Sequence, residues 1–434
     1  MWKVVLGKLE ENSLLSGKGD KGVQSRKNII WNAFGNIVYL GCQWLVTVFV
    51  TRIFGLKEAG MLSLAMSISA MFQTIALFGI RNYQVSDTGQ KYTDGTYMGF
   101  RSITCIVAML LCMLFSHINR YGMGQMGAIF WFMLFRLAED YSDALYGIAQ
   151  KNGRLDIVGR AFTVKGLVSI SMFFGGCHVT GNLGATLAIM AVSSWISTGL
   201  FDLPYIRKKF PFELKGKIAD CLLLGKETFP LCVYMFLLSA ISSTPKYILE
   251  KICDTSVLGA YSSIFAPALL IQAAAGYIYS PFVMPFAEYY QNGKEKDFLK
   301  LERKLCLIIL EVAVGILVLG GIFGIYILRF IFGEVVYGYE SLLIPVLFST
   351  ILLSYLAFYC MLEVVMRDFK GLIVGCMVGE VFCVVTTPFL IYGFGANGAS
   401  YGLGIGAAAG GVYMVVCMRC KWKACRQARE SEKL

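Results

Sequence analysis

The chain alternates between long apolar runs and short breaks rich in Gly, Asn or charged residues. A helix needs about 20 consecutive apolar residues to cross the roughly 30 Å hydrocarbon core of a bilayer. Runs of this length lie near residues 29–51, 59–80, 97–118, 127–149, 158–178, 183–203, 221–245, 257–286, 304–328, 341–362, 371–392 and 397–418. The alternation typical of a β-barrel is absent, so the pattern predicts an all-α integral membrane protein with about twelve transmembrane helices.

Composition agrees with a membrane protein and argues against catalysis. Apolar residues make up 57% of the chain and charged residues 15%, whereas soluble domains carry about 25% charged residues. Most of the 14 cysteines lie inside apolar runs, and Cys417, Cys420 and Cys425 have no neighbouring Cys or His pair that would complete a zinc site. Two histidines leave little material for histidine-centred catalysis. We therefore expect neither a metal site nor a cofactor.

The basic residues favour a cytoplasmic location for both termini. Lys and Arg are enriched in cytoplasmic loops of membrane proteins, and here they gather in residues 1–27, 206–220, 294–304 and the tail from 419. The opposite loops hold Arg52, Lys57, Arg120, Lys246, Lys251 and Arg329. This asymmetry explains the net charge of +11, so nucleic-acid binding is not expected. No apolar leader with a cleavage site precedes the first run, so residues 1–27 are expected to be cytoplasmic.

Two short repeats divide the apolar runs into halves. Gly60 and Ser63 follow the first run, and Gly259 and Ser262 follow the seventh run 199 residues later. The segments GNLGAT and GANGAS precede the sixth and twelfth runs. Parallel repeats predict two pseudo-symmetric six-helix lobes around a central cavity, which suits a transporter that works by alternating access. The expected domains are an N-terminal segment (1–27), an N-terminal lobe (28–205), a linker (206–220), a C-terminal lobe (221–418) and a basic tail (419–434).

The fourth run ends in the charged segment FRLAEDYSDALYGIAQKNGR (135–154). At roughly 100° per residue, Arg136, Glu139, Asp140 and Asp143 share one arc of a helix, and Leu134 lies on the opposite side, which suits lipid or packing. A charge inside a bilayer costs a few kcal/mol, so the arc is expected to face a partner or a cavity. One interpretation is structural, with Arg136 paired to Glu139 and Asp140 along its own helix. The other is functional, because three carboxylates and one arginine leave unbalanced charge.

Further ionisable residues lie in or near other runs. Arg81 and Lys165 add positive charge to the first half, whereas Arg101 is expected to extend to the membrane interface. Glu311 and Glu380 are surrounded by apolar residues, which indicates either protonated, hydrogen-bonded carboxyls or groups that titrate during transport. Five prolines are expected to interrupt and bend the seventh and eighth runs: Pro230, Pro245, Pro267, Pro281 and Pro285.

Several stretches resemble a known family. NAFGNIVYLGCQWLVTVFVTRIFG, followed by EAGMLSLAMSI and LFGIRNYQVSD, is similar to the first two spans of polysaccharide-type flippases. FRLAEDYSDALYGIAQKNGRLDIVGRA resembles the stretch that joins their spans four and five. These flippases lie in the multidrug/oligosaccharidyl-lipid/polysaccharide (MOP) transporter superfamily. The resemblance covers roughly residues 25–205, and the remainder agrees through topology.

The resemblance implies a fold and a substrate. It implies two six-helix lobes that form a V around a central cavity, as in MATE transporters. It also implies flipping of an undecaprenyl-diphosphate-linked oligosaccharide from the inner to the outer leaflet of the bacterial cytoplasmic membrane, for surface polysaccharide biosynthesis. Arginine binds phosphate in forked, charge-assisted pairs, so Arg81, Arg136 and Lys165 are the expected substrate-binding residues. Arg52 is the expected residue of an outer gate.

Energy coupling and partners complete the hypothesis. The chain has no phosphate-binding loop of the G-x-x-x-x-G-K-[ST] type, so an H⁺ or Na⁺ gradient is expected to act through Glu139, Asp140, Asp143, Glu311 or Glu380. We expect a monomer that contacts membrane lipids and the lipid-linked oligosaccharide, with a polysaccharide polymerase and glycosyltransferases as partners. The alternative is an H⁺- or Na⁺-coupled multidrug antiporter whose carboxylates bind organic cations. A third hypothesis, an enzyme acting on lipid-linked sugars, needs acid/base residues near an interface, and we expect no enzymatic activity.

Overall fold

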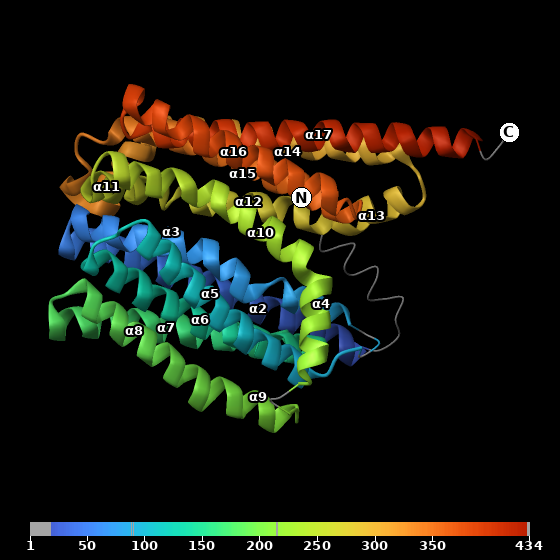
Figure 1. The fold of residues 1–434 in the computed structure, drawn as a ribbon, viewed down its shortest axis with the longest axis horizontal. Helices are drawn as coiled ribbons and strands as arrows, with labels where there is room; N and C mark the ends of the chain where they lie inside the picture. The colour runs from blue at the N-terminus through green and yellow to red at the C-terminus, as the bar shows by residue number, and fades with distance from the viewer. Residues whose placement is uncertain (1–18, 88, 90, 214–215, 432–434) are drawn as a thin grey trace.

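Each of the twelve apolar runs is helical in the computed structural model, which describes residues 19–87, 89, 91–213 and 216–431. The expected N-terminal segment lies outside these residues up to position 18, and the C-terminal tail lies outside them from position 432. Two bundles lie side by side with their helices running roughly along one direction (Figure 1). The blue-to-green bundle is the N-terminal lobe, and the yellow-to-red bundle is the C-terminal lobe.

The N-terminal lobe is built from the first half of the chain. Its elements are α2 (Gly19–Phe54), α3 (Leu56–Leu77), α4 (Ile80–Ser86), α5 (Asp94–Ile118), α6 (Met123–Lys151), α7 (Leu155–Thr180), α8 (Leu183–Ser197), the π-helical turn η1 (Thr198–Asp202) and α9 (Leu203–Lys209). The expected linker, 206–220, overlaps the end of α9 and the first turn of the next helix. Helices α8, η1 and α9 follow one another without a break and form the sixth crossing.

The C-terminal lobe is built from the second half. Its elements are α10 (Ile218–Ile252), α11 (Thr255–Phe265), α12 (Ala268–Tyr279), η2 (Ser280–Phe282), α13 (Val283–Gln291), α14 (Glu295–Phe332), η3 (Gly333–Val336), η4 (Glu340–Leu342), α15 (Leu343–Val365), α16 (Phe369–Phe394) and α17 (Asn397–Ser431). Instead of ending at the membrane, α17 continues as a helix through most of the expected basic tail, and it projects beyond the bundle (Figure 1).

Two of the twelve crossings differ from the others. Ten spans among the described residues are long and apolar enough to cross a membrane on length and composition alone. The two remaining crossings are α6, which carries the charged arc, and the eighth crossing, which is divided into α11, α12 and α13 at Pro267 and around Pro281. The prolines therefore break the eighth run as predicted. The prediction was wrong for the seventh, because α10 remains one helix through Pro230 and Pro245.

The two ends of the bundle are distinguished by their loops. We call the end that carries residues 55, 119–122 and 253–254 the gate end, and the end that carries residues 87–93, 152–154 and the α9–α10 connection the linker end. In Figure 1 the gate end is on the left and the linker end is on the right. The positive-inside rule predicts that the linker end is cytoplasmic.

The lobes meet at the gate end through the residues of the sequence repeat. Helix α3 packs against α11, and a Cβ atom added to Gly60 would overlap the carbonyl oxygen of Thr255. Likewise, a Cβ atom added to Gly259 would overlap the carbonyl oxygen of Leu56. Leu56 and Thr255 are separated by the same 199 residues as the two glycines. The contact is therefore isologous, as expected at a pseudo-twofold axis.

Polar side chains surround this glycine contact. The hydroxyl groups of Ser63 and Ser262, which are also related by the repeat, form a hydrogen bond across the two lobes. Thr51 Oγ1 lies 3.1 Å from Ser263 Oγ in a second buried bond. Small residues allow the two backbones to approach closely, which is the usual basis of helix association in membranes.

Helix α10 contacts both lobes. Near the linker end, its Glu227 accepts hydrogen bonds from Tyr83 Oη at 2.5 Å and from Lys91 Nζ, both in the N-terminal lobe. This hydrogen bond raises the pKa of Lys91. Leu224 packs in the same region against an apolar cluster that includes Phe100. Towards the gate end, α10 also packs against α16 of its own lobe, where Thr244 donates a hydrogen bond to Glu380.

A disulfide tests the gate-end contact. In protein carrying Ser63→Cys and Ser262→Cys, we expect a mild oxidant to link the lobes, because the parent hydroxyls are in hydrogen-bonding contact. Adding Gly60→Val should reduce the yield of linked peptide at least tenfold, since overpacking costs about 1–3 kcal/mol and about 1.4 kcal/mol corresponds to a factor of ten. Mass spectrometry measures the yield. Gly41→Val is the control, because a Cβ atom there meets nothing within 4 Å; equal losses in both variants would contradict the assigned contact.

Candidate functional site

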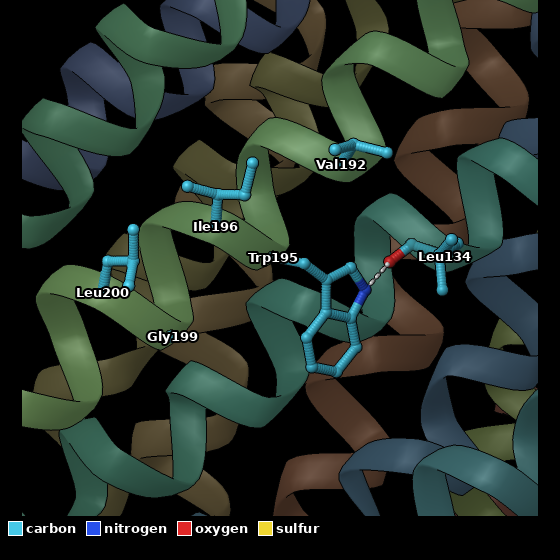
Figure 2. A pocket seen from close by; sticks show the side chains of 6 residues that line it. All are labelled: Leu134, Val192, Trp195, Ile196, Gly199 and Leu200. Carbon is cyan, nitrogen blue, oxygen red and sulfur yellow. Dashed lines mark hydrogen bonds between the residues drawn. The ribbon is translucent and has the colours of Figure 1, made fainter.

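The apolar side of α6 is used for packing inside the N-terminal lobe. Leu137 and Leu145 are buried, and the indole Nε1 of Trp195 on α8 donates a hydrogen bond of 3.0 Å to the carbonyl oxygen of Leu134 (Figure 2). The hollow beside this bond is lined by apolar side chains of α8, including Val192 and Ile196. Because α8 covers this side, the charged arc of α6 faces α2, α3 and α4.

Arg136 lies at the centre of the arc and bonds to three helices. Its Nη1 forms an ion pair of 2.7 Å with Glu139 one turn along α6, and lies 3.2 Å from Tyr39 Oη on α2. Its Nε and Nη2 both donate to Gln73 Oε1 on α3, at 3.3 and 3.0 Å. Tyr39 also donates a hydrogen bond to Glu139. The Arg136 side chain nevertheless remains 27% exposed.

Gln73 connects the arginine to the neighbouring acid. Its Nε2 donates a hydrogen bond of 2.6 Å to Asp140 Oδ1, while its Oε1 accepts from Arg136. The predicted Arg136–Asp140 ion pair is replaced by this amide bridge. The second oxygen of Asp140 is buried and has no hydrogen-bond partner among the described residues. Gln73 could have been identified from the sequence as an isolated amide within an apolar run, because such side chains commonly form hydrogen bonds between membrane helices.

The linker-end part of the arc is held by two more arginines. Asp143 accepts from Arg81 Nη1 at 2.7 Å and from Arg101 Nη2 at 3.4 Å. Arg81 Nε also donates to Gln150 Oε1 at 3.0 Å. Arg81 is 23% exposed, whereas Arg101 is completely buried and also donates to the carbonyl oxygen of Ala76. The prediction that Arg101 extends to the interface was therefore wrong, because a carboxylate and a carbonyl oxygen inside the lobe solvate its charge.

These contacts correct the predicted charge imbalance. The sequence suggested three carboxylates facing one arginine, but α4 and α5 supply two further guanidinium groups to the same region. Three cations therefore stand against the three carboxylates of α6. Burial of an ionised group in low dielectric is tolerable when it is paired and hydrogen-bonded. The arc is a balanced network with two partly exposed guanidinium groups, Arg81 and Arg136.

Lys165 belongs to a separate network on another side of α6. Its Nζ forms an ion pair of 2.8 Å with Asp202 in the π-helical turn, and donates to Ser142 on α6. Tyr146 Oη donates to the same Asp202 at 3.0 Å. Lys165 is buried, so in this conformation the structure does not bring it together with Arg81 and Arg136.

The C-terminal lobe places Glu311 and Glu380 apart from each other. Glu380 Oε1 accepts a hydrogen bond of 2.6 Å from Thr244 Oγ1 on α10, and Oε2 has no partner among the described residues. Glu311 is exposed on the side of α14 away from its buried stripe. Lys246, which the sequence assigned to an outer loop, lies inside α10 with Nζ 4.2 Å from the centre of the Phe265 ring. It forms no ion pair with a described residue. Because the sequence analysis assigned Lys246 to a loop, this cation within a predicted membrane span was missed.

Arg52 lies at the gate end, as a gate residue should. It is in the last turn of α2, and its Nη2 donates a hydrogen bond to the carbonyl oxygen of Phe330 on α14, in the other lobe. Lys251 and Asn119 form another hydrogen bond between lobes at this end. The gate end is therefore closed by side-chain contacts in addition to the glycine crossing.

The described side chains offer no constellation for a bound metal. No group of three or more His, Cys, Asp or Glu residues within the described ranges could hold a metal ion. The cysteines whose side chains the structure describes are free thiols.

Comparison with known proteins finds one similar sequence and several similar folds. No protein-family model matches the chain. The capsular polysaccharide biosynthesis protein CapF of Staphylococcus aureus is 24% identical over 323 residues, which cover 74% of this chain and 80% of CapF. An inward-facing multidrug resistance MATE family transporter of the MOP superfamily matches with a TM-score of 0.72 at 11% identity, covering 92% of this chain and 99% of that one. The lipid II flippase MurJ, in its inward closed conformation, matches with a TM-score of 0.68 at 13% identity, covering 90% and 87%.

These matches show the fold: the chain shares the two-lobe helical fold of a MATE family transporter and of MurJ, and ten of its described spans are long and apolar enough to cross a membrane. The resemblance to the polysaccharide flippase family is confirmed by CapF together with the MATE and MurJ structures. The structural neighbours are transporters and flippases rather than enzymes.

Removing the Gln73 amide tests the bridge between Arg136 and Asp140. We expect Gln73→Leu to lower the free energy of unfolding by about 2–3 kcal/mol, because it leaves the buried Asp140 carboxylate without its hydrogen-bond donor and removes one acceptor from Arg136. Thermal and chemical unfolding of detergent-solubilised protein measure the change. Gln43→Leu is the control, since that amide on α2 makes one bond of 3.2 Å to Ser169 Oγ, and about 1 kcal/mol is expected. Equal losses in the two variants would contradict the bridging role.

Proposed function

We propose that the protein flips a lipid-linked oligosaccharide, carried on undecaprenyl diphosphate, from the inner to the outer leaflet of a bacterial cytoplasmic membrane. The observation that carries this proposal is a pair of partly exposed arginines at the charged arc of α6: Arg136 on α6 itself and Arg81 on α4, which is paired with Asp143 of the arc. Arginine donates to phosphate oxygens in planar, forked pairs. Each guanidinium is already held in place by a carboxylate and an amide, so little ordering is needed for binding.

The lobe contacts support the proposed direction of transport. The described polar contacts between α2–α9 and the helices after α10 lie at the gate end. At the linker end, the described polar contacts between the lobes run through α10. With the linker end in the cytoplasm, as the basic loops favour, the space between the lobes would open toward the leaflet in which the substrate is made. The similarity to CapF, a capsular polysaccharide biosynthesis protein, and to MurJ, a lipid II flippase, also supports the proposal.

The balanced arc suggests how an ion participates. A diphosphate that takes Arg81 away from Asp143 leaves that carboxylate without its nearest counter-charge. A proton or sodium ion at the carboxylate would offset the loss, so binding of the cation and binding of the diphosphate favour each other. We propose Asp143 and Glu139 as the first coupling sites, because each is paired with a partly exposed arginine. Asp140, Glu380 and Glu311 remain further candidates.

Export of organic cations is the second candidate function. The similarity to MATE structures and the three carboxylates on α6 favour it. The network weakens it, because each of those carboxylates already accepts from an arginine or an amide. The proposed partners are membrane lipids, a polymerase and glycosyltransferases, and the proposed functional unit is a monomer.

The first functional test replaces Arg136 by alanine. In proteoliposomes that contain an undecaprenyl-diphosphate oligosaccharide, we expect Arg136→Ala to lower the flipping rate by about 10- to 100-fold, the range expected when a charge-assisted hydrogen bond of about 1.5–3 kcal/mol is lost. Accessibility of the sugar to an external lectin measures the rate. Arg136→Lys should recover part of the rate, since the charge remains but the fork is lost.

The matched control is Arg329→Gln. Arg329 is also a partly exposed arginine paired with a carboxylate, Glu340, at 2.9 Å, but it lies at the gate-end terminus of α14, away from the arc. Its variant should flip at nearly the wild-type rate. Loss of folded Arg136→Ala protein, measured by size-exclusion chromatography, would instead assign the arginine to the fold. Unchanged flipping together with uptake of an organic cation would favour the multidrug alternative.

The second functional test removes the charge of Asp143. We expect Asp143→Asn to bind undecaprenyl diphosphate more tightly than wild type, because loss of the carboxylate charge releases Arg81 from its ion pair. The expected gain is about tenfold, the equivalent of one charge-assisted hydrogen bond of about 1.5 kcal/mol. Fluorescence titration measures the affinity. Glu340→Gln should behave as wild type; weaker binding by Asp143→Asn would reject the exchange.

A further inference from the structure

A groove runs along the outer side of the N-terminal lobe, between α7 and the continuous segment α8–η1–α9. It has a volume of about 580 Å³, within the range of about 300–1,000 Å³ usual for ligand sites. Helices α7, α8 and α9 pack on α2, α6 and one another. In Figure 1, α8 and α9 lie on the side of the N-terminal lobe away from the C-terminal lobe. A ligand therefore reaches the groove from the membrane and not from the space between the lobes.

The charges along this groove favour an anion. Arg160, in the second turn of α7, and Lys208, in the last turn of α9, line it and are exposed near the linker end. Neither forms an ion pair with a described carboxylate. Arg160 is held in position because its guanidinium lies 5.1 Å from the centre of the Trp31 ring. Asp202 is the residue with a carboxylate among the described residues that line the groove, and its charge is already paired with that of Lys165.

The walls next to these cations suit an acyl chain. Val164 on α7 is 55% exposed, and Leu200 and Phe201 of the π-helical turn are each 68% exposed. All three line the groove. Single π-helical turns occur often at functional sites, and here the turn contributes both apolar side chains and Asp202 to one surface. The groove therefore has an apolar part and a cationic part, which matches one lipid molecule with an anionic headgroup.

We propose that this groove binds an anionic phospholipid, such as phosphatidylglycerol, from the leaflet at the linker end. The headgroup phosphate lies between Arg160 and Lys208, and an acyl chain packs along Val164, Leu200 and Phe201. The site is independent of the proposed flipping site, because it uses none of Arg81, Arg136 or Asp143. A bound lipid stabilises the N-terminal lobe around the π-helical turn.

A second hollow beside α8 shows what the groove adds. The hollow of Figure 2 is lined by Leu134, Val192, Trp195, Ile196, Gly199 and Leu200. Its described lining residues carry no charge, so it can accept any acyl chain but cannot select a headgroup. Headgroup selection is expected from the groove with Arg160 and Lys208.

Native mass spectrometry of the full, delipidated chain tests the proposal. We expect phosphatidylglycerol to bind about 30-fold more tightly than phosphatidylethanolamine with the same acyl chains, since each basic side chain near an anionic lipid contributes about 1 kcal/mol. The double variant Arg160→Gln/Lys208→Gln should bind both lipids equally. The control Lys296→Gln/Lys300→Gln, which removes the same charge from exposed positions at the start of α14, should keep the full preference.

Thermal unfolding with each lipid gives an independent measurement. Phosphatidylglycerol should raise the unfolding temperature of wild type and of the α14 control, but not of the groove variant. An unchanged preference in the groove variant, or an equal loss in the α14 control, would overturn the proposal in favour of general surface attraction. Displacement of phosphatidylglycerol by equimolar undecaprenyl diphosphate would overturn it in favour of a substrate site.

Discussion

The need to neutralise the charges of α6 inside a bilayer governs the arrangement of the N-terminal lobe. An ionised group in hydrocarbon costs several kcal/mol unless it has a counter-charge and hydrogen bonds. Asp143 is satisfied by arginines from α4 and α5, Asp140 by Gln73 from α3, and Glu139 by Arg136 and by Tyr39 from α2. Each bond requires a different helix to lie against the arc. One charged stripe therefore fixes the relative positions of five helices, which apolar packing in lipid alone would leave less specific.

The proposed flipping by alternating access requires the same lobe to move relative to its partner, and the contact between lobes is suited to that. Gly60 and Gly259 let α3 and α11 cross at backbone distance, and hydroxyl groups surround the crossing. A small contact of this kind gains dispersion energy and a few hydrogen bonds, but it buries no charge that would have to be solvated again on opening. The ionic interactions of the charged arc lie inside the N-terminal lobe. Rigidity within the lobe and a weak contact between lobes are the conditions for rocking as rigid bodies.

Much of the fold could be predicted from the sequence, because hydropathy, loop charge and repeats are properties of single segments. The twelve crossings and the shared arc of Arg136, Glu139, Asp140 and Asp143 follow from period and length alone. The identity of the facing partners does not, because helical periodicity places a residue around its own axis but not against a particular neighbour. For this reason Gln73 was missed, Arg101 was assigned to the interface, and Lys165 was grouped with residues from which Asp202 separates it. Lys246 was assigned to a loop because α10 continues past the expected end of the seventh run.

Helix α10 connects the rigid lobes to the motion between them. Near the linker end its Glu227 is bonded to Tyr83 and Lys91 of the N-terminal lobe, and near the gate end its Thr244 is bonded to Glu380 of the C-terminal lobe. When the lobes rock, the distance between these two attachment points must change. Pro230 lies between them, and a proline inside a helix removes one backbone hydrogen bond and allows bending there. Because α10 can bend at Pro230, it can follow lobe movement while both attachments stay intact. A helix without this proline would resist the bending.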